Sequence, residues 1–176
     1  MHIVFSLFYA PFVFYSLKHF DIRTVSLIIF ATSLIWFLFA LKKDMESALF
    51  PFFYICVSLL CFFIGSFIIL KSLPLLISVL VGLYFFYSFL TKNSVIITFA
   101  KRFKKNISQK EEQYIQGSSL IWVAASLVNI FIHSFVLLDD NINYWIIYST
   151  FGWYFVFVTA FIVQMIHKKL FFKETI

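Results

Sequence analysis

The sequence predicts an all-α fold, a polytopic bundle of about six transmembrane helices. Of the 176 residues, 62% are apolar and 23% are aromatic, whereas only 12% are charged. An average soluble domain is roughly half apolar and about a quarter charged, so this chain has too few ionic groups to cover a water-exposed surface. The mean hydropathy of +0.97 points the same way. These values exclude a soluble globular protein and a disordered one.

Charged residues divide the chain into apolar runs that are long enough to cross a bilayer. A hydrocarbon core of ~30 Å needs about 20 helical residues, within a range of roughly 17–25. Backbone in lipid must satisfy its own hydrogen bonds, which runs of this length do as helices, and the strict alternation of barrel strands is absent. One transmembrane domain is expected over residues 1–176, with spans at 2–17, 24–41, 48–70, 73–91, 118–138 and 143–166.

Two boundaries need comment. The first span is short, since 16 residues rise only about 24 Å, and Pro11 inside it removes a helix hydrogen bond, so full crossing by residues 2–17 stays open. The third and fourth runs meet at Lys71-Ser72-Leu73-Pro74. This pattern predicts a tight helical hairpin, with Pro74 in the first turn of the fourth helix. No Asp, Glu, Lys or Arg lies within any predicted span.

The distribution of Lys and Arg predicts the orientation. The chain carries 14 Lys and Arg against 8 Asp and Glu. With both termini in the cytoplasm, eleven of the basic residues fall in internal segments and three, Lys18, Arg23 and Lys71, fall outside. The positive-inside rule favours this arrangement, so the basic excess is read as a membrane-orientation signal and not as a nucleic-acid surface.

The cytoplasmic loop 92–117 carries six of the eleven internal basic residues. Its first part is apolar and then basic, so as a helix it is expected to lie in the interface, with its cations toward anionic headgroups. The candidate lipid contacts are Lys101, Arg102, Lys104 and Lys105. Simple anchoring by the positive-inside rule is the alternative. Ser108 and Glu111 then match an N-cap and its capping-box partner, so the fifth helix is expected to begin about two turns before the membrane.

Polar side chains inside the spans are costly and are the default places to look for function. Trp122, Ser126, Asn129 and His133 are spaced 4, 3 and 4 residues apart, so they form one stripe on the fifth helix. The sixth helix adds Tyr148, Ser149 and Gln164 to the candidate polar face. Two interpretations stay open: a lining for a headgroup or small ligand, and hydrogen bonding between helices.

Catalytic and metal-binding patterns are missing from the sequence. It contains no GxSxG, no HExxH and no Gly-rich phosphate loop, and its four His residues are scattered. Cys56 and Cys61 stand five apart, off a shared helix face, and are expected to pack as free thiols. We therefore expect no cofactor, no metal and no enzymatic activity.

Residues of the last two helices resemble a known group of proteins. Tyr114, Trp122 and Asn129 stand at spacings of eight and seven residues. The following segment contributes Trp145, Tyr148, Ser149, Tyr154 and Gln164. This pattern resembles the small, uncharacterised bacterial inner-membrane proteins found beside aryl-polyene and fatty-acid-like lipid biosynthesis genes. The chain departs from that pattern in having Gln116 and Gly117 for an Arg pair, Ser149 for an Asn and Gln164 for a Glu.

The layout is also more distantly similar to the intracellular septation protein A family. Both resemblances imply a multi-pass protein of the bacterial inner membrane with a role in the cell envelope. The resulting expectation is a non-enzymatic accessory of envelope or lipid and polyene biosynthesis that binds membrane lipids or partner proteins. The alternatives are a transporter or flippase for a lipid or polyene product, an envelope or septation maintenance protein, and a membrane-embedded transferase that uses Asn129 and His133.

Overall fold

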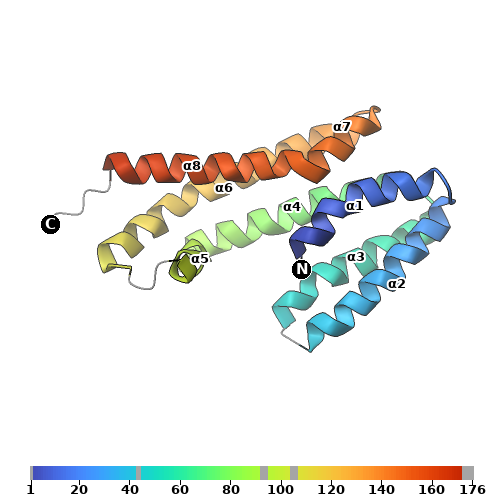
Figure 1. The fold of residues 1–176 in the computed structure, drawn as a ribbon, viewed down its shortest axis with the longest axis horizontal. Coiled ribbons are helices and arrows are strands. Elements are labelled where there is room, and N and C mark those ends of the chain that lie inside the picture. Colours follow the sequence, from blue (N-terminus) through green and yellow to red (C-terminus); the bar gives the residue numbers. More distant parts are fainter. Residues whose placement is uncertain (1, 43–44, 92–94, 104–106, 172–176) are drawn as a thin grey trace. The chain divides into compact units, whose positions relative to one another are not determined.

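In this computed structural model, residues 2–42, 45–91, 95–103 and 107–171 are described. The structure is 91% helix, and no strand occurs among the described residues (Figure 1). The predicted all-α fold is confirmed.

The long helices fall close to the predicted spans. They are α1 (His2–Leu17), α2 (Ile22–Leu41), α3 (Met45–Ile64), α4 (Phe67–Leu90), α6 (Gln109–Leu138) and the final segment of α7 (Ile142–Ile147), the π-helical segment η1 (Tyr148–Gly152) and α8 (Trp153–Phe171). Within the described residues, five segments are long and apolar enough to cross a membrane, and α1 adds a shorter apolar stretch, Phe8–Leu17. The chain is therefore a multi-pass integral membrane protein.

Helix starts are set by short polar side chains. The Asp21 carboxylate accepts hydrogen bonds from the backbone N–H groups of Arg23 at 3.0 Å and Thr24 at 3.3 Å, which places the start of α2 two residues before the predicted span. Asn141 caps α7 in the same way, through the N–H of Asn143 at 3.0 Å. The predicted cap of α6 is confirmed, since the Glu111 N–H donates to the Ser108 hydroxyl at 3.2 Å.

The helices group into two compact units, each described by itself. Unit 1 comprises residues 1–77 and 133–151, and unit 2 comprises residues 78–132 and 152–176. In unit 1, α2 packs along α3 (Figure 1), and an aromatic cluster joins α1 to this pair. The Tyr54 ring packs edge-on against Tyr9 and Trp36, with centroid distances of 5.3 Å and 5.7 Å. All three side chains are buried, so this cluster is the core of unit 1.

The turn between α3 and α4 lies earlier than predicted. It falls at Gly65 and Ser66 instead of Lys71 to Pro74. Gly65 has φ +70°, a left-handed conformation that glycine adopts at the lowest cost, and its N–H bonds to the Cys61 carbonyl at 2.7 Å to close the helix end.

Pro74 lies inside α4, where a distant side chain supplies the hydrogen bond that the helix lacks. Proline has no N–H, so the carbonyl of Leu70, four residues earlier, has no helical donor. The Tyr9 hydroxyl donates to that carbonyl at 3.1 Å. The indole N–H of Trp145 donates to the neighbouring Lys71 carbonyl at 2.9 Å. Both donors are buried, and they hold α4 through the position at which the sequence predicted a loop.

Lys71 therefore lies in a membrane-spanning helix, contrary to the expectation that no charged residue does. Its side chain is only 8% exposed, and Nζ donates to the Asp139 carbonyl at 2.6 Å. Asp139 follows the end of α6, so the ammonium lies at the end of the bundle where the α6–α7 turn is, and not at mid-membrane.

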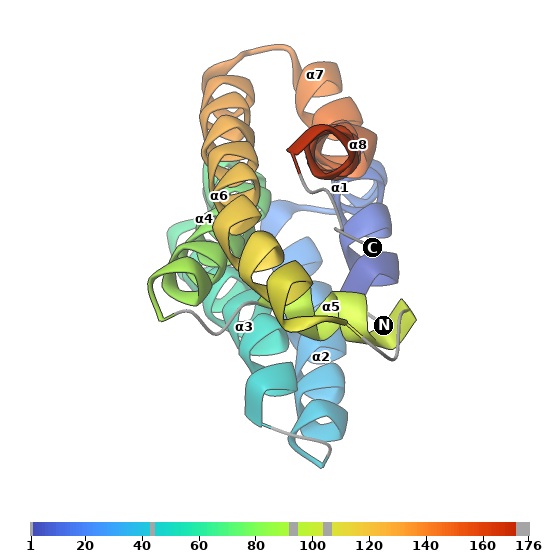
Figure 2. The same ribbon diagram turned by 90° about the vertical axis from the view of Figure 1, so that its left-hand side faces the viewer.

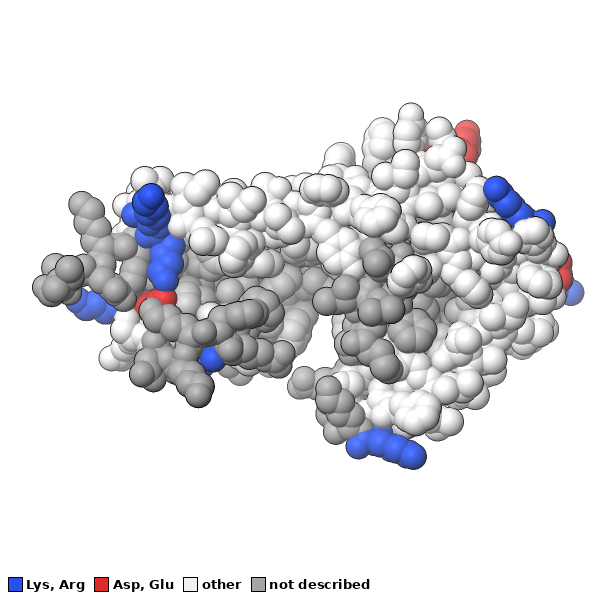
Figure 3. Space-filling model, viewed as in Figure 1, with Lys and Arg blue, Asp and Glu red and all other residues white. Residues whose placement is uncertain are grey.

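In unit 2, α4 and α6 run alongside each other, and α8 lies along α6. The short helix α5 (Val95–Phe103) lies across their direction at the end of α4, seen end-on in Figure 1 and from the side in Figure 2. The Val95 N–H donates to the Ser88 hydroxyl at 2.9 Å, which fixes the start of α5 against α4. On the face drawn in Figure 3, the described Lys and Arg side chains gather near helix ends. This is the charge distribution of a membrane-spanning bundle.

Candidate functional site

Two residues of the predicted polar stripe on α6, Trp122 and Asn129, hydrogen-bond to other helices. The Trp122 indole N–H donates to the Gln164 Oε1 on α8 at 2.8 Å. Asn129, which is 2% exposed, donates through Nδ2 to the Ser78 hydroxyl on α4 at 2.9 Å. These bonds satisfy polar groups that would be costly in hydrocarbon, and they join α6 to α8 and to α4 within unit 2.

Gln164 is the centre of a continuous polar seam between α6 and α8. Its Nε2 donates to the Ser118 hydroxyl at 2.7 Å, and its backbone carbonyl accepts from the Tyr114 hydroxyl at 3.2 Å. The Tyr114 hydroxyl also lies 2.9 Å from the Nδ1 of His167. The two amide groups of Gln164, side-chain and backbone, therefore bind three residues of α6.

An ion pair closes this seam at the end where α6 begins. Lys168 of α8 pairs with Glu111 of α6, whose side chain is only 3% exposed. The sequence reasoning missed Ser118, Glu111 and Lys168. A signal was present for Ser118 and Glu111, because extending the stripe back from Trp122 by steps of three and four residues reaches Ser118, Tyr114 or Ile115, and Glu111. The stripe does not reach Lys168, which lies on α8.

His133, Tyr148 and Ser149 lie in unit 1 and not with the seam. The His133 ring packs edge-on against Tyr148, with a centroid distance of 4.7 Å. Ser149 is 3% exposed, and its hydroxyl has no hydrogen-bond partner among the described residues. The stripe residue Ser126 donates to the Trp122 carbonyl of its own helix at 2.8 Å. The predicted polar face is thus divided among three separate environments.

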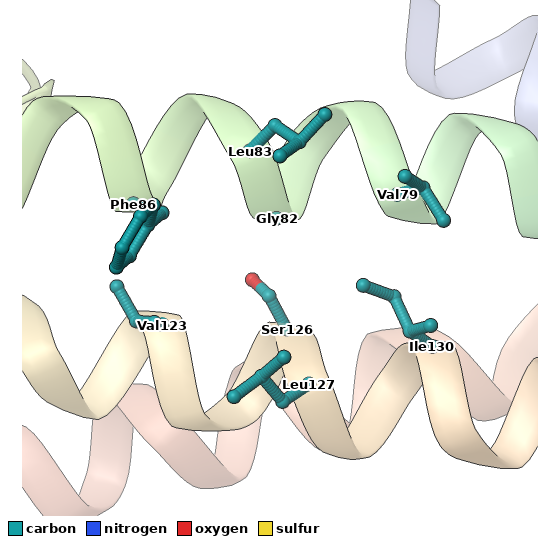
Figure 4. Close-up of a pocket in the computed structure, with 8 residues that line it drawn as sticks. All are labelled: Val79, Gly82, Leu83, Phe86, Val123, Ser126, Leu127 and Ile130. Carbon is teal, nitrogen blue, oxygen red and sulfur yellow. The ribbon is translucent and has the colours of Figure 1, made fainter.

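The Ser126 side chain also faces an apolar groove between α4 and α6 (Figure 4). The groove has a volume of about 280 Å³. Its walls come from α4 and α6: Val79, Gly82, Leu83, Phe86, Val123, Ser126, Leu127 and Ile130. Leu83 and Leu127 at its rim are 58% and 62% exposed, so the groove opens onto the outer surface of unit 2.

Gly82 allows α4 and α6 to approach closely at the floor of this groove. A Cβ atom at this position would lie 3.1 Å from Cδ1 of Ile130 and 3.4 Å from Cβ of Ser126. Small residues are used in this way where transmembrane helices cross. Neither the close approach nor the groove is visible in the sequence, because both depend on how the two helices are placed.

Little of the predicted basic cluster falls within the described structure. Lys101 is exposed and pairs with Glu112 of α6 at 2.5 Å, which holds α5 against the start of α6. The side chain of Arg102, and Lys104 and Lys105 entirely, lie outside the described residues. Nearby, Gln116 donates from Nε2 to the Phe89 carbonyl at 3.2 Å, which satisfies one of the open carbonyls at the end of α4.

Comparisons with known proteins find no relative of this chain. No protein-family model, curated protein or solved structure matches this chain. Among the described residues, no group of three His, Cys, Asp or Glu side chains is placed to hold a metal ion.

Proposed function

We propose that this chain is a non-enzymatic, lipid-binding accessory protein of the bacterial inner membrane. The observation that carries the proposal is the apolar groove between α4 and α6. It opens on the surface of two membrane-spanning helices, where acyl chains take the place of solvent. Its volume of about 280 Å³ is close to the lower end of the roughly 300–1,000 Å³ range of ligand pockets, which suits a single acyl chain.

The depth of the groove supports a lipid of one leaflet. Its α4 residues extend from Phe86 back to Val79, or roughly 6 to 17 Å from the helix end at Leu90 at 1.5 Å per residue. Half of a ~30 Å hydrocarbon core is about 15 Å, so the groove covers the leaflet next to α5. A chain in the groove therefore places its headgroup at the level of α5, where Lys101 is exposed.

The biological setting rests on the resemblance described from the sequence. Tyr114, Trp122, Asn129 and Tyr154 carry that resemblance, and they support a role beside envelope, lipid or polyene biosynthesis enzymes. In this setting the protein would hold a lipid intermediate, or a partner enzyme, at the membrane.

A transporter or flippase for the same class of product is the second candidate. The observation that favours it is η1, which interrupts the last membrane-spanning segment with a π turn. Interrupted helices in transporters are places where substrate or ions bind. A measurement of product distribution between the two leaflets in a deletion strain distinguishes this candidate, because an accessory protein leaves that distribution normal.

The groove is tested by filling it from its rim. Leu127→Trp adds a large side chain at an exposed lining position, so it blocks an acyl chain without overpacking the helix contact. Val128→Trp is the matched control, since Val128 is 51% exposed at the same depth but does not line the groove. Native mass spectrometry of the purified protein should show one retained lipid in the wild type and in Val128→Trp, and a several-fold loss in Leu127→Trp. Equal lipid retention by both variants would contradict the proposal.

The headgroup contact is tested separately. Replacing Lys101, Arg102, Lys104 and Lys105 with Gln should weaken binding to phosphatidylglycerol vesicles while leaving the groove intact. Lys169→Gln, at the end of α8, removes a cation outside this cluster and serves as the control. Unchanged vesicle binding of the fourfold variant would contradict the headgroup contact, and α5 would then serve only to anchor the chain at the interface.

A further inference from the structure

Two neighbouring hydroxyl groups in η1 are buried without a hydrogen-bond partner. Ser149 is 3% exposed and Thr150 is 4% exposed, and both lie inside the last membrane-spanning segment. Neither hydroxyl oxygen has a partner among the residues that the structure describes. Such groups are rare in native proteins, and a bound water molecule or ion is one explanation for them.

Other hydroxyl groups of the chain show what is expected in a membrane helix. They donate to a carbonyl three or four residues earlier in their own helix, as Ser26 does to Ile22 at 2.7 Å and Ser58 to Ile55 at 2.9 Å. Ser149 and Thr150 depart from this pattern in a π-helical segment, where the turn is wider than in an α-helix. Isolated π turns occur frequently at functional sites.

The surroundings in unit 1 favour a neutral ligand. The described contacts place Lys71 and Asp139 at the start of α7: the Lys71 Nζ donates to the Asp139 carbonyl, and the Asp139 carboxylate accepts from the Asn141 N–H at 2.7 Å, eight positions or more before Ser149. The aromatic contact of Tyr148 is with His133, which is 3% exposed. A charged ligand at this depth would have no described counter-charge beside it, at a large cost in hydrocarbon.

We infer that Ser149 and Thr150 form a binding site for a neutral hydroxyl group within the membrane. A hydroxyl group both donates and accepts, so it matches either of these side chains, each of which does the same. An ordered water molecule and the hydroxyl of a neutral lipid, such as a diacylglycerol, are the two sources of this chemistry. The site shares no residue with the α4/α6 groove and does not depend on the function proposed for that groove.

Stability measurements test this site. Removal of a buried hydroxyl that has a hydrogen-bond partner lowers the stability of the protein, whereas removal of one without a partner leaves it unchanged or raises it. Ser149→Ala and Thr150→Val remove the hydroxyl with little change of shape. If a ligand is bound, each variant should lower the unfolding midpoint by about 2–4 °C. Thr150→Ser retains the hydroxyl and should recover most of the loss. Ser58→Ala is the control, since its hydroxyl is buried but bound to its own helix.

The detergent composition distinguishes the two sources. A loss of stability in detergent free of neutral lipid assigns the site to water. A loss that appears only after addition of dioleoylglycerol, together with an upward shift of the wild type, assigns it to the lipid. Variants that unfold at the wild-type temperature or above it under both conditions would overturn the inference, because the hydroxyl groups would then be unsatisfied.

Discussion

The Tyr9 hydroxyl donates a 3.1 Å hydrogen bond to the Leu70 carbonyl, the acceptor that Pro74 leaves without a helical donor. The two residues are 61 positions apart, so the first helix completes a defect in the fourth. Tyr9 is itself held edge-on by Tyr54 at 5.3 Å. The short helix α1 is therefore a structural part of unit 1.

Tyr9→Phe should destabilise the protein because it leaves the Leu70 carbonyl buried without a donor. The expected loss in unfolding free energy is about 1–3 kcal/mol. Pro74→Ala restores the helical N–H, so the same Tyr9 change should cost much less in that background. Unfolding of the double-mutant cycle in detergent measures the coupling, and equal losses in both backgrounds would contradict this account.

Gln164→Ala should loosen the seam between α6 and α8. It removes the side-chain hydrogen bonds to Trp122 and Ser118, which average about 0.6 kcal/mol each in membrane proteins, so a loss of about 1 kcal/mol is expected. Gln113→Ala, at an exposed position on α6, is the control. Chemical unfolding in micelles measures both variants. A loss for Gln113→Ala as large as for Gln164→Ala would argue against the seam.

Two glycines should respond to alanine with opposite signs. Gly65 has φ +70°, so Gly65→Ala forces a left-handed conformation that costs roughly 1–2 kcal/mol, although no atom lies within 4 Å of the added methyl group. Gly117 lies in α6 with the same free space, so Gly117→Ala should stabilise by roughly 0.5–1 kcal/mol. Unfolding free energies test the pair, and a tolerated Gly65→Ala would contradict the placement of the turn.

The Asp21 cap predicts a pH dependence outside the membrane. The Thr24 hydroxyl and then the Thr24 N–H donate to the carboxylate and hold the pKa of Asp21 below its ordinary value of 3.8. Because the folded pKa is the lower one, the stabilisation is present above the ordinary pKa and is lost as pH falls through the folded pKa.

Thr24→Val removes the largest of these contributions. The pKa of Asp21, followed by NMR of the labelled carboxyl carbon, should therefore rise toward its ordinary value. Thr32→Val is the control. It removes a hydroxyl that bonds to carbonyls of its own helix, so it should leave the titration of Asp21 unchanged. An unchanged Asp21 titration in Thr24→Val would show that the hydroxyl is not the cause.

The spans were predictable because hydrophobic length is a local property of the sequence. The turn before α4 was not, since Lys71 and Pro74 have the composition of a loop. They remain helical because Tyr9, which is distant in sequence, supplies the donor that Pro74 lacks, and Trp145 adds a hydrogen bond to the Lys71 carbonyl. Gly65 was the local signal for the true turn, and a search for a residue able to adopt positive φ would have found it.

The polar stripe was predictable from helical spacing, but its use was not. Spacing alone places Trp122 and Asn129 on one face and leaves their partners open. The partners, Gln164 and Ser78, lie on two different helices, and the groove depends on how α4 and α6 are placed around the close approach at Gly82. The π turn at Ser149 depends on backbone hydrogen bonding that no residue pattern in this segment marks.

Photo-crosslinking in cells tests the central claim most directly. Cells fed a fatty acid with a diazirine along its chain would be irradiated, and labelled peptides of the protein mapped by mass spectrometry. A lipid held in the groove predicts labels concentrated at residues 79–86 and 123–130, and their loss in Leu127→Trp. Labels spread evenly over exposed apolar residues such as Phe131 and Phe155, 71% exposed in each case, would contradict a lipid-binding groove between α4 and α6.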